Sequence, residues 1–242
     1  MKLILLLLLS FNVLAFDQTH FEWDKILKKY TVQEGNQVLF NYQELKKTPA
    51  EFEGYLRTLS NLKRVEFKSF SKKEKLAFWI NVYNAFTVKL IIDNYPVKSI
   101  KDIGGWFGSP WKIKFLEIFN KKISLDTVEH GIIRKDFNEA RIHFAVNCAS
   151  FGCPSLLPEA FTGKGLELQL DKAAKNFLTN TAKNKYVESS KTIYMSKIFK
   201  WYGDDFKSQY GSYKKFASKY ITFPTNAQVD WLDYDWNLNQ IK

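Results

Sequence analysis

Residues 71–95 read SKKEKLAFWINVYNAFTVKLIIDNY and decide the fold. Ser71 and Glu74 form a capping-box pattern, in which each side chain accepts a hydrogen bond from the backbone of the other residue. The pattern predicts a helix that begins after Ser71 and ends before Pro96, because proline interrupts a helix. Apolar residues occupy nearly every face of this helix, which is typical of a helix buried at the centre of a domain.

Shorter elements are predicted on both sides of this helix. Apolar spacing of three to four residues predicts further helices at about 20–30, 48–62, 124–136, 165–183, 196–206 and 212–220. Alternation of apolar and polar residues predicts short strands at about 37–42, 112–119, 141–147, 186–195 and 231–236. Helices outnumber strands, and no Pro/Gly/Ser-rich linker divides the chain. We therefore expect a single helix-rich α+β domain with a small, mostly antiparallel sheet.

The N-terminus has the pattern of a signal peptide. Lys2 precedes an apolar run at 3–9, and Val13-Leu14-Ala15 matches the small-x-small cleavage pattern. The run is shorter than the roughly 20 apolar residues that span a bilayer. We expect a signal peptide at 1–15 and an exported domain at 16–242, periplasmic or secreted and not membrane-spanning.

The charge of the chain is strongly positive but comes almost entirely from lysine. Its 242 residues include 36 Lys and Arg against 25 Asp and Glu, a net charge of +11. Sequence-reading nucleic-acid sites favour the planar fork of arginine, so we expect no nucleic-acid partner. A protein, a peptide or a cell-envelope component is the expected partner. No phosphate-binding loop, dinucleotide-binding glycine pattern or nucleophile-elbow serine occurs in the sequence, and we expect no cofactor.

Cys148 and Cys153 are the two cysteines of the chain. In an oxidising compartment they could form a disulfide, and the alternative is that one of them is a free, reactive thiol. Their spacing is wider than that of a zinc knuckle, so we expect no metal site. Regular alternation along 141–147 would point Cys148 into the core, whereas a turn after Asn147 would re-aim it.

A nucleophilic cysteine needs a base and a group that orients the base. His130 and His143 are the candidate bases, and Glu129 and Asn147 are the candidate orienting groups. The sequence leaves both choices open.

Asparagine side chains form a second set of candidates. Asn81 and Asn84 lie one turn apart on the central helix, and buried amides must find partners. They either tie down a neighbouring loop, which is the commoner role, or orient a loop beside a site. With Asn147, they are the candidate substrate-binding residues. Asn81, Asn84 or backbone N–H groups near the cysteine loop are the candidate donors to an oxyanion.

Three long motifs resemble domain-of-unknown-function family 547, and a fourth, YMSKIFKWYGDDF (194–206), supports them. The three are EKLAFWINVYNAFTVKLI (74–91), ISLDTVEHGIIRKDF (123–137) and RIHFAVNCASFGCPSL (141–156). The resemblance covers about 38–206. It implies a fold and chemistry like those of papain-like or transglutaminase-like thiol enzymes.

Two hypotheses follow. In the first, the chain is a thiol enzyme that acts on amide bonds, as a peptidase or an acyl transferase; Cys148 or Cys153 is the nucleophile, His130 the base and Glu129 its orienting group. In the second, the chain is a non-enzymatic module that binds an envelope component and contains a Cys148–Cys153 disulfide. In either case we expect the site where the Glu129–His130 helix meets the loop 148–154.

Overall fold

A computed structural model describes residues 15–35, 37–105 and 108–241. Its centre is α5 (Lys72–Asn94), in which every residue from 76 to 88 is buried. The capping box is present, because Ser71 accepts from the Glu74 N–H and Glu74 accepts from the Ser71 N–H. The predicted central helix is therefore confirmed, and its all-round apolar surface is explained by contacts on all sides.

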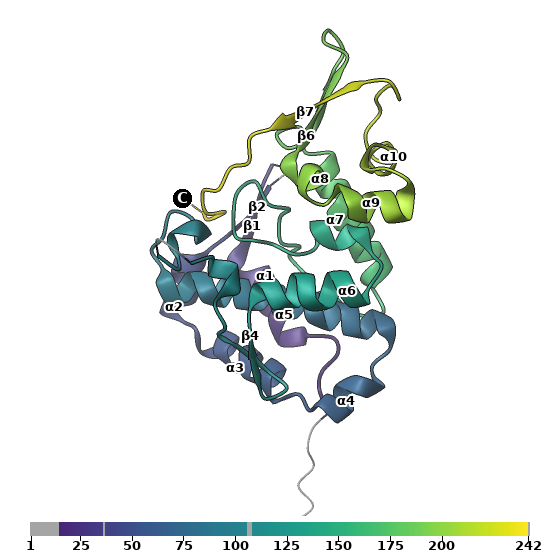
Figure 1. Cartoon of the computed structure of the whole chain (residues 1–242). Coiled ribbons are helices and arrows are strands. Elements are labelled where there is room, and N and C mark those ends of the chain that lie inside the picture. The colour runs from purple at the N-terminus through teal and green to yellow at the C-terminus, as the bar shows by residue number, and fades with distance from the viewer. Residues whose placement is uncertain (1–14, 36, 106–107, 242) are drawn as a thin grey trace, which may run out of the picture.

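Nine further α-helices are described around α5, and Figure 1 shows α3 and α4 at one end of the molecule and α8 to α10 at the other. They are α1 (Phe21–Tyr30), α2 (Tyr42–Lys47), α3 (Ala50–Asn61), α4 (Arg64–Ser69), α6 (Arg134–Asp136), α7 (Leu166–Leu178), α8 (Lys197–Trp201), α9 (Gly203–Tyr210) and α10 (Tyr213–Ala217). Other helical turns are η1 (Ile100–Asp102), η2 (Pro110–Lys112), η3 (Thr127–Ile133) and η4 (Ala140–Phe144).

The strands form three small sheets in the described part of the chain. They pair as β1 (Thr31–Glu34) with β2 (Gln37–Phe40), β3 (Leu116–Ile118) with β4 (Lys121–Ile123), and β5 (Lys185–Val187) with β6 (Thr192–Ser196) and β7 (Gln228–Leu232). All pairs are antiparallel except β6 with β7. The helix-rich α+β class is confirmed, with three sheets in place of one.

The predicted strand at 141–147 is wrong, because residues 140–144 form the 3₁₀ turn η4. Every residue from Ile142 to Asn147 is buried. The alternation of residue types along this segment therefore does not correspond to a buried face and an exposed face of a strand. The turn begins at Glu139, whose carboxylate accepts from the Arg141 N–H. Such a local side-chain cap favours a turn over an extended strand.

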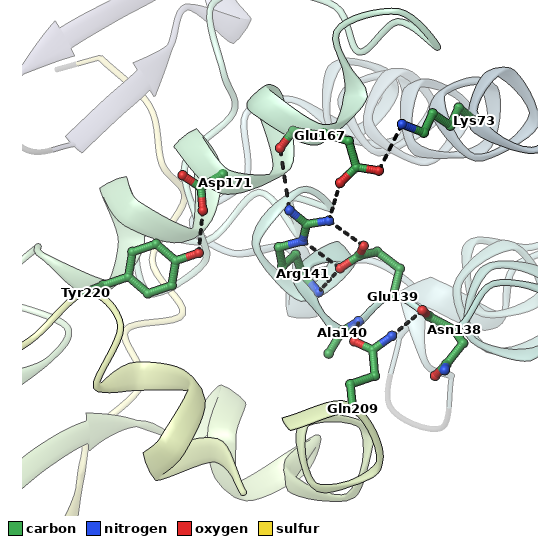
Figure 2. A network of polar contacts seen from close by, with 9 residues as sticks. All are labelled: Lys73, Asn138, Glu139, Ala140, Arg141, Glu167, Asp171, Gln209 and Tyr220. Carbon is green, nitrogen blue, oxygen red and sulfur yellow. Dashed lines mark hydrogen bonds and ion pairs between the residues drawn. The ribbon is translucent and has the colours of Figure 1, made fainter. Parts of the chain in front are cut away.

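A polar network fixes η4 against the rest of the molecule (Figure 2). The Arg141 guanidinium pairs with Glu139 at 2.6 Å and with Glu167 of α7 at 2.7 Å, and Glu167 also pairs with Lys73 of α5. From α9, Gln209 accepts from the Ala140 N–H. A five-residue 3₁₀ turn has little stability of its own, so these contacts determine where its side chains lie.

Two other predicted helices are interrupted at positions that matter for the site. The helix expected at 196–206 divides into α8 and α9 at Tyr202. The helix expected at 124–136 is a π-helix, η3, followed by α6. The predicted signal peptide lies almost entirely in 1–14, outside the described residues. Within the described ranges, no helix is both long and apolar enough to cross a membrane.

Candidate functional site

A cavity of about 330 Å³ lies between η3, the loop after η4, α8 and the C-terminal tail. Its reactive and charged lining residues are Asp126, Glu129, His130, His143, Cys148 and Cys153. Its aromatic lining residues are Tyr83, Trp111, Trp201, Tyr202, Tyr234 and Trp236. The segments that carry Glu129–His130 and the two cysteines therefore line one cavity.

The cysteine loop turns sharply after Asn147. Ala149 has a left-handed backbone with φ of 58°, and the Asn147 side chain accepts from its N–H. This turn leaves Cys148 half-buried at the cavity and Cys153 buried behind it. The Cys148 N–H donates to Cys153 Sγ at 2.8 Å, and both cysteines are free thiols in the structure.

The sulfur of Cys148 is surrounded by hydrogen-bond donors. Ser150 Oγ lies 3.1 Å from it and the Tyr234 hydroxyl 3.3 Å from it. Burial raises the pKa of Cys148, but hydrogen bonds from Cys153, Ser150 and Tyr234 outweigh burial and lower the pKa to about 7. Burial and the neighbouring Cys148 raise the pKa of Cys153. These surroundings favour ionisation of Cys148 at the cavity over ionisation of Cys153 behind it.

The three candidate asparagines use both ends of their amides on the backbone. Asn84 donates to the Ala145 carbonyl and accepts from the Asn147 N–H. Asn147 donates to the Pro154 carbonyl, and Asn81 bridges the N–H and the carbonyl of Phe161. Their contacts hold loops in place, and Asn84 and Asn147 together fix the entry to the cysteine loop.

Glu129 lies in the π-helix η3, where the Arg134 N–H reaches back five residues to the Glu129 carbonyl. Such wide turns are frequent at functional sites. The Glu129 side chain is 6% exposed and accepts a hydrogen bond from the Tyr202 hydroxyl at 2.9 Å. Glu129 therefore holds Tyr202, and within the described residues no hydrogen bond joins its side chain to His130.

His130 is exposed at the cavity and bonds to Arg134 across one helical turn. Arg134 Nη1 lies 3.2 Å from His130 Nδ1. Because a guanidinium can only donate, Nδ1 accepts and the proton of the neutral ring lies on Nε2. Within the described residues, no hydrogen bond joins a histidine to either sulfur. In this arrangement the Nε2–H group of His130 is a hydrogen-bond donor.

His143 belongs to a buried ion-pair network beside the cavity. Its Nε2 lies 2.7 Å from Asp205, which also takes two hydrogen bonds from Arg134. The ring stacks on Tyr202 with centroids 3.9 Å apart. Burial lowers the pKa of His143 despite Asp205, and bonds from His143 and Arg134 lower the pKa of Asp205.

Five residues of the site were missed from the sequence: Tyr83, Asp126, Tyr202, Asp205 and Tyr234. Tyr83 lies on α5 between the two asparagines, and Asp126 lies three residues before Glu129, so both were within quoted motifs. Tyr234 reaches Cys148 across 86 residues of sequence, a proximity that no local pattern signals.

The fold and site define an α+β protein with a thiol-lined cavity. Residues 67–178 match a family described as "Protein of unknown function, DUF547", and the match supports the assignment of this segment as a domain of that family. No protein of curated function matches the chain, and no solved structure matches it.

Proposed function

We propose that this chain is a thiol-dependent enzyme that acts on amide bonds, as a peptidase or an acyl transferase, with Cys148 as the nucleophile. The observation that carries the proposal is the half-buried Cys148 sulfur at the cavity, with a pKa of about 7. Since the thiolate is the reactive form, about half of the molecules hold the nucleophile at neutral pH without an added base.

Cys148 supplies the nucleophile of such a reaction. The Cys148 thiolate attacks the carbonyl carbon, the carbon–nitrogen bond breaks, and the leaving nitrogen takes a proton from solvent water. A thioester remains on Cys148, and water or an amine then cleaves it.

The backbone N–H groups of the cysteine loop are engaged within the protein, as for Cys153 with the Ser150 carbonyl. Tyr83 is 1% exposed, lines the cavity, and its hydroxyl has no partner among the described residues. We assign the oxyanion donor to Tyr83.

Thiol–disulfide exchange is a second candidate, favoured by the contact between Cys148 and Cys153. Here Cys148 would attack a substrate disulfide, and Cys153 would attack the resulting mixed disulfide and release the second substrate thiol. Cys153→Ser separates the candidates. It should trap a mixed disulfide on Cys148 in an exchange enzyme, whereas amide chemistry should continue.

The test of the proposed function is the reactivity of Cys148. Labelling by iodoacetamide, followed residue by residue by mass spectrometry, should rise with pH around a midpoint of about 7 for Cys148. With peptide p-nitroanilides, acid quenching should reveal a thioester on Cys148 that is absent in Cys148→Ser. A labelling midpoint at the ordinary thiol pKa would remove the basis of the proposal.

We also propose that the chain is exported and cleaved after Ala15. The Phe16 nitrogen lies 2.5 Å from Glu66 Oε1, and its ring packs against Phe70 and Phe78. Cleavage would convert this nitrogen into an ammonium that already has a carboxylate partner. Mass spectrometry of the protein from an envelope fraction should show an N-terminus at Phe16, and an intact Met1 would contradict cleavage.

A further inference from the structure

The cavity carries a charge opposite to that of the chain. The net charge of the protein is +11, yet among the described residues the formally charged side chains that line the cavity are the carboxylates Asp126 and Glu129. No lysine or arginine occurs among these lining residues. A cavity lined by one sign of charge concentrates ligands of the other sign.

The cations around the cavity are engaged elsewhere. Arg134 donates to Asp205 at 2.7 and 2.9 Å. Lys183 donates to the Cys153 carbonyl behind the loop. Lys101 lies over the Trp236 ring, 3.6 Å from its centroid. Neither carboxylate forms an ion pair among the described residues, although Arg134 lies near enough to Glu129 for an electrostatic interaction.

Asp126 is the N-cap residue of η3, Glu129 lies within η3, and both line the cavity. In the described part of the chain, the Asp126 carboxylate has no hydrogen bond and no ion pair. Two like charges in one cavity repel each other, and a bound cation would offset this repulsion.

An aromatic cluster forms another part of the lining. The Trp201 and Tyr234 rings are 4.9 Å apart, and Tyr234 and Trp236 are 4.6 Å apart. The negative faces of such rings attract organic cations. No group of three metal-binding side chains is found among the described residues, so the lining suits an organic cation better than a metal ion.

One buried polar atom points to an occupant of the same cavity. Nδ1 of His143, a residue that is 3% exposed and lines the cavity, lacks a partner among the described residues. Buried polar groups are normally satisfied, and a polar ligand would satisfy this nitrogen.

We infer that the substrate carries an organic ammonium group, bound between the Asp126 and Glu129 carboxylates and the rings of Trp201 and Tyr234. This inference rests on the proposed function and names its substrate class: an amide or amine with a cationic group near the reacting atom, such as a basic side chain of a peptide.

The experiment compares two thiol reagents of matched size and opposite charge. All proteins carry Cys153→Ser, so that Cys148 is the single thiol. The probes are the cationic 2-aminoethyl and the anionic 2-sulfonatoethyl methanethiosulfonate. The measured quantity is the rate of reaction of Cys148 with the cationic probe divided by its rate with the anionic probe. This ratio is then divided by the same ratio for free 2-mercaptoethanol. This division removes the intrinsic preference of a thiolate for the cationic reagent.

We expect a normalised ratio of about tenfold or more in favour of the cation. Asp126→Asn and Glu129→Gln should each lower it several-fold. Asp136→Asn, which removes an exposed carboxylate outside the cavity lining, should leave it unchanged. A normalised ratio of one or less, or one unaffected by Asp126→Asn in a folded variant, overturns the inference. Failure of Cys148 to react with either reagent would instead overturn the proposed function.

Discussion

His20 is a buried imidazole in the N-terminal half of the molecule. It is 3% exposed, and its Nδ1 lies 2.8 Å from the Tyr55 hydroxyl. Burial lowers its pKa from 6.5 to about 4, against a smaller opposing effect of Asp17. Between these two pH values the unfolded chain binds a proton that the folded chain does not. His20 therefore makes stability rise with pH through this window.

We predict that the protein loses about 3 kcal/mol of stability through His20 between pH 6.5 and pH 4, from the size of the pKa shift. His20→Asn removes the titration and suits the left-handed backbone at this position, where φ is 52°. Urea unfolding at pH 7 and pH 4.5 should show a smaller pH-dependent loss in the variant. Identical losses in the two proteins would contradict the pKa shift of His20.

At the scale of elements, α7 shows how burial on one face holds a helix to the core. Leu170 is 1% exposed and Leu168, two residues earlier, is 80% exposed. Leu170→Ala should lower the free energy of unfolding by about 2–5 kcal/mol through lost burial and a new cavity. Leu168→Ala is the matched control and should change it by less than about 0.5 kcal/mol. Chemical denaturation measures the free energy of unfolding of both variants. Equal losses would contradict the assignment of Leu170 to the buried face of α7 and Leu168 to its exposed face.

The length of an element decided how well the sequence predicted it. The helix α5 has a capping box and a 23-residue apolar pattern, and its bounds were predicted closely. The turn η4 has five residues, four of them buried, and tertiary contacts such as those of Arg141 with Glu139 and Glu167 fix it in place. The π-turn η3 likewise differs from an α-helix by one hydrogen-bond register that residue spacing does not encode.

The sequence also predicted some residues of the candidate site and not others. Glu129, His130 and the cysteines were found because these residue types are reactive and cluster in the sequence. Their partners were not found, since Asp205 and Tyr234 approach only through the tertiary fold. The roles changed accordingly: Glu129 pairs with Tyr202, and His130 pairs with Arg134.

At the scale of the whole molecule, the family segment does not build the cavity alone. The match ends at residue 178, whereas Trp201, Tyr202, Tyr234 and Trp236 line the cavity from beyond it. The C-terminal tail follows β7 and lies against the cysteine loop, where the Gly152 N–H donates to the Asp235 carbonyl at 2.8 Å. The surroundings of Cys148 thus include a segment outside the matched region.

Gly152 of the cysteine loop lies close against the backbone of the tail. A Cβ at this position would lie 2.9 Å from the backbone N and O of Asp235. Gly152→Ala should push the tail away, which limited proteolysis should detect as faster cleavage near the C-terminus. The control is Gly54→Ala in α3, where the nearest atom to the new Cβ is 3.8 Å away. That change should leave cleavage unaltered and favour the helix by up to about 1 kcal/mol.

Tyr234 provides the most direct test of the role of the tail in the chemistry of Cys148. Its hydroxyl lies 3.3 Å from the Cys148 sulfur and donates to it when the sulfur is a thiolate. A hydrogen bond to a charged group contributes about 1.5–3 kcal/mol, and one pKa unit corresponds to about 1.4 kcal/mol. Tyr234→Phe should therefore raise the pKa of Cys148 by about 1–2 units from its value of about 7.

The measurement is the pH midpoint of iodoacetamide labelling at Cys148, which should move upward in Tyr234→Phe while the fold is retained. Tyr194→Phe on β6 removes a hydroxyl that does not line the cavity and should leave the midpoint in place. An unchanged midpoint in a folded Tyr234→Phe protein would show that Ser150 and Cys153 stabilise the thiolate without the tail. The tail would then serve only to enclose the cavity.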